Sequence, residues 1–220
     1  MLDKKVVIID YGMGNLFSIK NACAHVGIES RITSCIDEVL SSDGIILPGV
    51  GAFGKAIDTL ESLGLLLVIR SSIESGKPFM GICLGLQLLM TESCEFGKHK
   101  GLNLISGSVK RFENEVLDNR ILKVPHVGWN EIILKEKIGS KSGHTFLKDF
   151  NSCEYMYFVH SYYVEPEDKS IVLTTTKYGS IEFCSSIQYK NIFACQFHPE
   201  RSGEKGLQIY RNFRNLLVGS

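Results

Sequence analysis

Cys83 is the residue of this sequence whose surroundings most clearly indicate chemistry. It lies in a Gly-x-Cys-x-Gly pattern, between Gly81 and Gly85, where one apolar run ends and another begins. The two glycines let the backbone pass close to a strand and a helix, as in a nucleophile elbow. The N-terminus of the following helix favours the thiolate, which is the reactive form of cysteine. The sequence therefore predicts that Cys83 is a covalent nucleophile.

The other six cysteines have neither flanking glycines nor a switch from strand to helix. We interpret them as small apolar or surface residues: Cys23, Cys35, Cys94, Cys153, Cys184 and Cys195. Seven is an odd number and no Cys-x-x-Cys pair occurs, which favours a reducing compartment over a disulfide framework. The first residues lead into an apolar strand without a signal-peptide pattern, so we expect a cytoplasmic protein.

His198 and Glu200 supply the partners that a cysteine nucleophile needs. Such a nucleophile requires a base, and the base requires a group that orients it. In an extended segment, residues i and i+2 point to the same side, so His198 and Glu200 would share a face across Pro199. Taken singly, each is better explained as a structural histidine or an exposed carboxylate. Together with Cys83, they predict a catalytic triad.

A second glycine-rich turn occupies residues 48–54, after an apolar strand and before a predicted helix. It satisfies the Gly-x-Gly-x-x-Gly pattern of dinucleotide sites. Such a site needs an acidic residue at the end of the next strand, where this sequence has Cys83. We therefore interpret the turn as an oxyanion loop. Its backbone amides would act with the amide of Leu84 on the oxygen of a tetrahedral intermediate.

The elements that must position these residues alternate between strand and helix in the first third of the chain. The apolar run at residues 6–10 lacks two-residue alternation, as expected for a parallel strand covered on both faces. Further strands are predicted at 30–33, 44–47 and 79–82, and helices at 16–26 and 52–74. This order predicts an open, mainly parallel α/β sheet flanked by helices, with its chemistry at the carboxyl ends of the strands.

After about residue 105 the pattern changes to short segments typical of antiparallel strands. They are predicted at residues 108–112, 129–134, 155–164, 171–176 and 181–188. A last strand at 193–197 ends at His198, and a closing helix is predicted at 206–217. Residues 135–143 are expected to form an exposed loop. No repeat or break in composition divides the chain, so we expect a single domain over residues 1–220.

Composition excludes several classes of function. The chain has 220 residues, 44% of them hydrophobic, which is enough for a full core. The 24 basic and 24 acidic residues cancel, so no net field attracts nucleic acid or an anionic membrane. No apolar run approaches the ~18 residues that span a bilayer. No metal-ligand spacing is present, so we expect neither a metal nor a cofactor.

Three motifs together resemble one family, the glutamine amidotransferases with a cysteine triad. They are residues 47–54, 81–87 and 196–200. Residues 123–130 and 157–162 further resemble the glutaminase subunits of imidazole glycerol phosphate synthase within that family. The resemblance covers nearly the whole chain. It implies a flavodoxin-like amidotransferase fold with a nucleophile elbow and antiparallel β additions in the C-terminal half.

The resemblance also implies a reaction, the hydrolysis of L-glutamine to glutamate and ammonia. Cys83 would attack the side-chain amide, His198 would protonate the ammonia and later activate water, and Glu200 would orient the imidazole. The residues whose backbone amides are implied to bind the oxyanion are Val50, Gly51 and Leu84. Those implied to hold glutamine are Gly49, Gln87, Glu95, Ser161 and Tyr162.

In this family the ammonia passes to a (β/α)8-barrel cyclase subunit, which forms imidazole glycerol phosphate and AICAR in histidine biosynthesis. The implied partner surface comprises Asn15, His126, Trp129, Tyr157 and Arg201. A lone tryptophan is often a core residue, so a structural role for Trp129 is an equal alternative. Arg201 stands where the family commonly has lysine, and a planar guanidinium is not equivalent to an ammonium in an ion pair.

Three alternatives remain open at the level of sequence. The same glutaminase chemistry could supply ammonia for amidating a surface-polysaccharide sugar precursor. A cysteine peptidase on a similar sheet could use the same elbow and histidine. A non-catalytic subunit could keep the fold for docking alone. We further hypothesise that the loop at residues 48–54 reorients an amide when the partner docks, so that the isolated chain is a poor glutaminase.

Overall fold

The computed structural model describes residues 4–114, 116–117, 120–135 and 146–219. All but the first residue of the loop expected at 135–143 lies outside the described residues. Within the described residues, thirteen strands join one sheet, and β8 (Val116–Leu117) and β9 (Arg120–Ile121) form a separate pair. None of the helices found in these residues is long and apolar enough to span a bilayer.

The first half of the sheet is parallel, in the order β2-β1-β3-β4. These strands are β1 (Lys5–Ile9), β2 (Glu29–Thr33), β3 (Gly44–Leu47) and β4 (Phe79–Ile82). Side chains alternate between the two faces of a strand, so both faces of β1 need a cover. Val7 and Ile9 belong to one buried cluster, whereas Val6 and Ile8 belong to the other. The prediction of an apolar strand buried on both faces is thus confirmed.

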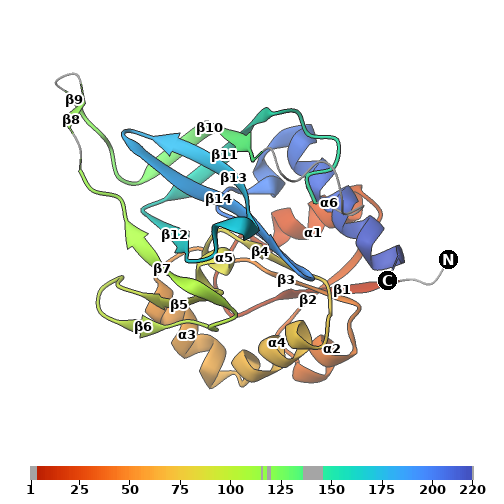
Figure 1. The fold of residues 1–220 in the computed structure, drawn as a ribbon. Helices are drawn as coiled ribbons and strands as arrows, with labels where there is room; N and C mark the ends of the chain where they lie inside the picture. Colours follow the sequence, from red (N-terminus) through yellow and green to blue (C-terminus); the bar gives the residue numbers. More distant parts are fainter. Residues whose placement is uncertain (1–3, 115, 118–119, 136–145, 220) are drawn as a thin grey trace.

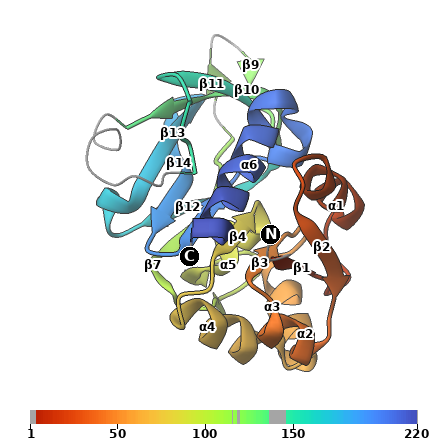
Figure 2. The same cartoon turned by 90° about the vertical axis from the view of Figure 1, so that its right-hand side faces the viewer.

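Helices supply the two covers (Figures 1 and 2). On one side lie α2 (Ile36–Ser41), α3 (Phe53–Ser62) and α4 (Leu65–Glu74); on the other lie α1 (Leu16–His25) and α6 (Gly203–Gly219). The single helix expected at 52–74 is wrong, because Gly64 has a left-handed φ of 69° and separates α3 from α4. Glycine tolerates this conformation, which ends the first helix there.

The second half of the sheet is mainly antiparallel and extends the parallel half through β15 (Ile192–Cys195). Its main strands are β7 (Ile105–Arg111), β10 (His126–Leu134), β11 (Cys153–His160), β12 (Tyr162–Pro166), β13 (Val172–Tyr178) and β14 (Ile181–Tyr189). The expected strand at 155–164 is two strands that meet at Ser161, because β11 pairs with β10 while β12 pairs with β7 and β14. The fold class is as predicted.

Smaller elements complete the site. The helix after β4 is α5 (Leu84–Leu88), and it is followed by the β5 (Met90–Ser93) and β6 (His99–Lys100) hairpin, which the sequence did not suggest. The described residues include two 3-10 turns, η2 (Lys169–Ile171) and η3 (Pro199–Arg201). Because β15 pairs in parallel with β4, the chain leaves both strands at the same edge of the sheet. That edge therefore holds Cys83 and the segment that begins at Gln196.

Candidate active site

Cys83 lies on a sharp turn between β4 and α5, with φ 55° and ψ −105°. A positive φ is costly for a residue with a side chain, and such strain often marks functional sites. The flanking glycines are needed for packing. A Cβ on Gly85 would lie 1.9 Å from the carbonyl oxygen of Leu47, and one on Gly81 would lie 3.0 Å from the Cβ of Ala194. The turn is a nucleophile elbow in its geometry as well as in its sequence.

His198 and Glu200 meet at this edge of the sheet. The Nδ1 atom of His198 lies 2.8 Å from Oε1 of Glu200, and both side chains are almost fully buried. The Nε2 atom makes no hydrogen bond of standard geometry within the described residues. The segment after His198 is the 3-10 turn η3, not the extended strand that the sequence reasoning assumed. The turn still brings the carboxylate to the ring, so Glu200 can orient the imidazole.

The charge state of His198 depends on its neighbours. Burial alone would lower its pKa, but the negative charge and hydrogen bonding of Cys83, followed by those of Glu200, raise the pKa to about 10. The histidine is therefore stable as an imidazolium when the cysteine is a thiolate. Such a pair has a nucleophile and a proton donor ready for acyl transfer.

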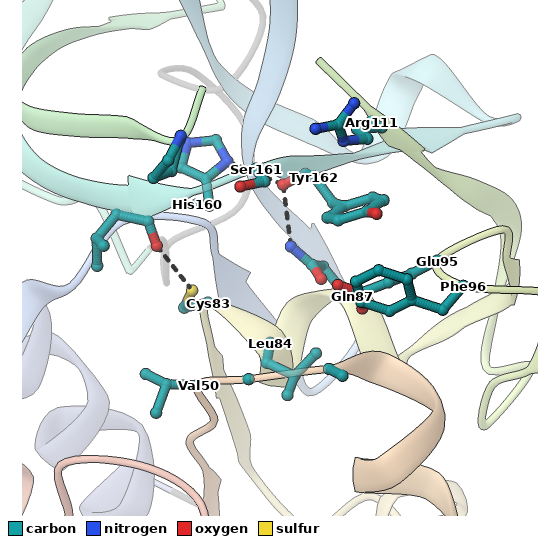
Figure 3. Close-up of a pocket in the computed structure, with 14 residues that line it drawn as sticks. Val50, Cys83, Leu84, Gln87, Glu95, Phe96, Arg111, His160, Ser161 and Tyr162 are labelled. Atoms are coloured by element: carbon teal, nitrogen blue, oxygen red, sulfur yellow. Dashed lines mark hydrogen bonds between the residues drawn. The ribbon is translucent and has the colours of Figure 1, made fainter. Parts of the chain in front are cut away.

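A cavity of about 560 Å³ opens over the elbow (Figure 3). Its volume lies within the usual range for small-molecule sites. Its lining includes Cys83, Leu84, Gln87, Glu95, Ser161 and Tyr162 together with Val50, Gly51, Phe96 and Arg111. Figure 3 shows that Cys83 and Val50 face the cavity from one end, while Glu95 and Phe96 lie near the other. The structure thus brings most of the expected substrate residues around one space.

The backbone amide of Leu84, which an oxyanion would need, is already hydrogen-bonded to the glycine-rich loop. The N–H of Leu84 donates to the carbonyl of Gly49 at 3.3 Å. In a planar trans peptide the N–H points opposite to the carbonyl, so the N–H of Val50 points away from Leu84. Gly49 is also close to Tyr11, whose hydroxyl oxygen would lie 2.3 Å from an added Cβ. In this conformation the Leu84 amide becomes available only if the Gly49–Val50 peptide turns.

Two expected substrate residues make structural contacts that the sequence did not suggest. The side chain of Gln87 is buried, and its Nε2 donates to the carbonyl of Tyr162 at 3.0 Å and to Oε1 of Gln196 at 3.2 Å. The carboxylate of Glu95 is also buried and accepts a hydrogen bond of 2.6 Å from the backbone N–H of Phe53. It thereby satisfies an orphan donor at the start of α3, where the N-cap side chain makes no such bond.

Phe96 and Arg111 line the cavity but were missed by the sequence reasoning. Phe96 lies in the connection between β5 and β6, has a positive φ of 53° and is highly exposed. Arg111 ends β7, on the far side of Tyr162 from Glu95 in Figure 3. Neither residue belongs to a local motif. Only the pairing of β7 with β12 brings Arg111 to the cavity, so no local signal could have identified it.

The residues expected on a partner surface fall into two groups. Trp129 and Tyr157 face each other across β10 and β11 with an edge-on ring contact, and Trp129 is 56% exposed, which argues against a core role. The guanidinium of Arg201 lies 4.1 Å from the centre of the Tyr157 ring. Asn15 is exposed and caps α1 by accepting from the N–H of Ser18. These residues lie at the surface.

His126 differs, because its side chain is buried and paired with His160. Since the carbonyl of Tyr162 can only accept, Nδ1 of His160 donates to it at 2.8 Å. The other nitrogen of a neutral His160 must then accept from Nδ1 of His126, which lies 3.0 Å away. The Nε2 of His126 in turn accepts from the Asn130 amide at 3.2 Å. Each of these ring nitrogens thus has a defined role only while both histidines are neutral.

Aromatic rings surround this histidine pair. His126 stacks on Phe158 and Tyr178, and His160 packs against Phe112. Burial lowers the pKa of His126 to about 4. Burial is also the main cause that lowers the pKa of His160 to about 3. The pair is therefore a neutral hydrogen-bonded support within the cavity wall, where His160 itself lines the cavity.

The fold and the site together define an α/β enzyme that places a cysteine on a strained turn beside a histidine and a glutamate. The family described as glutamine amidotransferase class-I matches residues 7–216, and the chain belongs to this family. Within the described residues no cluster of possible metal ligands is present.

Individual relatives show which members of the family this chain resembles. The chain is 47% identical over 212 residues to imidazole glycerol phosphate synthase subunit HisH of Syntrophotalea carbinolica, which covers 96% of this chain and 100% of that protein. It is also 47% identical to the protein of the same name from Aquifex aeolicus, over 96% of each chain. Among solved structures, PurLQS from Thermotoga maritima has a similar fold, with a TM-score of 0.71 and 20% identity over 98% of this chain and 100% of that one.

Proposed function

We propose that this chain hydrolyses L-glutamine and delivers the ammonia to a (β/α)8-barrel cyclase subunit, which forms imidazole glycerol phosphate and AICAR in histidine biosynthesis. The assignment to this pathway rests on the identity of 47% with synthase subunits over nearly the full length of both chains. We further propose that the chain folds as one domain. The free state of all seven cysteines favours a cytoplasmic location.

In the proposed reaction, the Cys83 thiolate attacks the carboxamide carbon of glutamine. The His198 imidazolium gives its proton to the nitrogen as the carbon–nitrogen bond breaks, which releases ammonia and leaves a glutamyl thioester. The now neutral His198 takes a proton from water, whose hydroxyl attacks the thioester and releases glutamate. Glu200 stabilises the imidazolium through its hydrogen bond to Nδ1.

The remaining residues are proposed to bind substrate and oxyanion. Ser161, Tyr162, Gln87 and Glu95 all line the cavity, and the side chains of Gln87 and Glu95 are buried. The amides of Val50, Gly51 and Leu84 would stabilise the oxyanion after the Gly49–Val50 peptide turns. Because Leu84 is occupied in the isolated chain, we expect slow turnover until a partner docks. The proposed contact surface consists of the exposed Asn15, Trp129 and Arg201 with the partly exposed Tyr157, whereas the buried His126 would support it from beneath.

The alternatives are less well supported. Supply of ammonia for a surface-polysaccharide sugar precursor would use the same site, but both relatives that are 47% identical to this chain are synthase subunits. Peptide cleavage would leave the full-length similarity to amidotransferases unexplained. A docking role alone would not require the hydrogen bond between His198 and Glu200.

The test is glutamate production from glutamine with and without the cognate cyclase subunit and its nucleotide ligand. We expect Cys83→Ala to abolish turnover in both conditions, and the control Cys94→Ala, at an exposed free cysteine, to leave it unchanged. Unchanged turnover in Cys83→Ala would refute the catalytic role. Equal wild-type rates with and without the partner would refute gating by the loop.

A further inference from the structure

Gln196 has a contact with the reacting sulfur that the proposed mechanism does not use. It follows directly after β15, its side chain is completely buried, and its backbone N–H donates to the carbonyl of Ser185 at 2.9 Å. Its Nε2 lies 3.5 Å from the sulfur of Cys83. The residue does not line the substrate cavity. Its buried amide is therefore directed at the nucleophile and not at the substrate.

The carbonyl of Tyr162 fixes the direction of the hydrogen bond between Gln196 and the sulfur. The carbonyl of Tyr162 can only accept, so the Gln87 side-chain atom bonded to it is the amide nitrogen. The same nitrogen lies 3.2 Å from the side chain of Gln196, where the nearer atom must be the oxygen, because two amide nitrogens cannot bond. The nitrogen of Gln196 is then the atom that faces the sulfur.

Contacts around the sulfur have opposite effects on the thiolate. The carbonyl of Val159 lies 3.9 Å from the sulfur, where a thiol can donate to it. Gln196 and the imidazolium of His198 instead favour the anion. The other titratable groups that face the sulfur are Tyr11 and Cys195, and burial is the main cause that raises the pKa of each. They stay neutral near pH 7, so Gln196 is the neutral donor that opposes Val159.

We propose that Gln196 is a catalytic residue that stabilises the Cys83 thiolate by donating a hydrogen bond to it, and that Gln87 is the positioning residue that fixes the orientation of the Gln196 amide. This inference deepens the proposed function and rests on Cys83 being the nucleophile. It also gives Gln87 a role besides the expected contact with glutamine, because the Tyr162 carbonyl and Gln87 together determine which end of Gln196 meets the sulfur.

The test is the pH dependence of Cys83 alkylation by iodoacetamide, followed by mass spectrometry of the peptide that contains Cys83. Alkylation needs the thiolate and no bound glutamine. Gln196→Met keeps the length and removes the donor. We expect it to slow alkylation at pH 7 about tenfold and to move the profile about one unit to higher pH, because the hydrogen bond is to a charged group. Glutamine turnover should lose kcat with KM nearly unchanged.

Two further variants sharpen the test. Gln87→Met should move the profile in the same direction by less, and adding it to Gln196→Met should cause no further shift, because both act through one hydrogen bond. Gln208→Met is the control on α6, where the amide bonds Asn212, and should leave the profile unchanged. If Gln196→Met does not fold, the Gln87→Met profile decides the question.

The alkylation experiment distinguishes a failure of this proposal from a failure of the proposed function. If Cys83 is reactive but the alkylation profiles of Gln196→Met and Gln87→Met equal that of the wild type, the role of Gln196 is wrong. The proposed triad would stay intact. A wild-type Cys83 no more reactive than the exposed Cys35 would refute the nucleophile itself.

Discussion

The described part of the chain contains two buried histidine sites, and one favours the charged form of histidine while the other favours the neutral form. Burial raises the cost of the charged form at both His198 and the pair of His126 and His160. At His198 the interactions with Cys83 and Glu200 more than offset that cost, and the pKa rises to about 10. Aromatic rings surround the pair instead, and its members stay neutral. Acidic neighbours, not depth of burial, therefore distinguish the proposed catalytic histidine.

Both sites contact the same part of the cavity wall. The carbonyl of Tyr162 accepts from His160 and also from Gln87, which bonds Gln196 beside the nucleophile. His160 of the neutral pair bonds this carbonyl directly, whereas the site of His198 is linked to it only through Gln87 and Gln196. A change of charge in the pair would break its chain of donors and acceptors, so neutrality is part of its structural role.

The largest effect is expected from removing the charge that makes the two sites differ. Glu200→Gln keeps the shape of the side chain but takes away the carboxylate that stabilises the imidazolium. We expect kcat for glutamine hydrolysis with the partner subunit to fall by about 10²–10⁴-fold. Glu204→Gln is the matched control, since Glu204 is exposed and pairs with Arg211. A kcat for Glu200→Gln equal to that of the control would remove Glu200 from the triad.

The next effect concerns stability in acid. The pKa values of His126 and His160 lie below the usual 6.5, so below that pH the unfolded chain takes up protons that the folded chain does not. Stability should fall from about pH 6.5 toward pH 4, by about 1.4 kcal/mol per pH unit for each histidine. His198 has the opposite sign, because its raised pKa gives a contribution that is complete below pH 6.5 and lost toward pH 10.

Denaturant unfolding at several pH values measures both trends. His160→Gln can still donate to the carbonyl of Tyr162 and accept from His126, but it does not titrate. We expect this variant to have a shallower loss of stability in acid and an unchanged loss in alkali. An acid slope identical to that of the wild type would show that the pair does not control the acid limb.

The smallest effect is expected from changing Arg201, at the surface end of the segment that holds His198 and Glu200. Arg201 follows the triad and stacks on Tyr157, whose backbone carbonyl accepts from the N–H of His198 at 2.9 Å. An exposed cation–π contact contributes about 0.5–1 kcal/mol, so Arg201→Ala should weaken affinity for the partner subunit only a few fold. Arg201→Lys should retain part of it. Titration calorimetry measures both, and a loss of a hundredfold would indicate a direct ion pair with the partner.

Much of the site could be predicted from sequence because its signals are local. The elbow needs glycines two residues before and after Cys83, and an added Cβ at either would meet nearby atoms. The histidine and the glutamate of the triad lie two residues apart on one segment. Most of the parallel half of the fold could also be predicted, because β1, β3 and β4 are apolar without alternation, whereas β2 is largely polar.

Other features depend on contacts between distant segments. Burial of His126 follows from the register of β10 and β11, which sets it opposite His160. The split of the expected strand at Ser161 results from a change of pairing partner. The hydrogen bond between the Leu84 amide and the Gly49 carbonyl depends on the orientation of the Gly49–Val50 peptide, which the residue types do not determine. Gln196 was visible in a motif, but its role needed the position of Gln87.

The central claim is that the strained Cys83 forms the covalent bond to glutamine. A glutamine analogue with a diazoketone in place of the carboxamide alkylates a thiolate that attacks at this position, and peptide mass spectrometry identifies the labelled residue. We expect label on Cys83 alone, prevented by excess glutamine and slowed in Glu200→Gln. Label on another cysteine, or none in a preparation that hydrolyses glutamine, would contradict it.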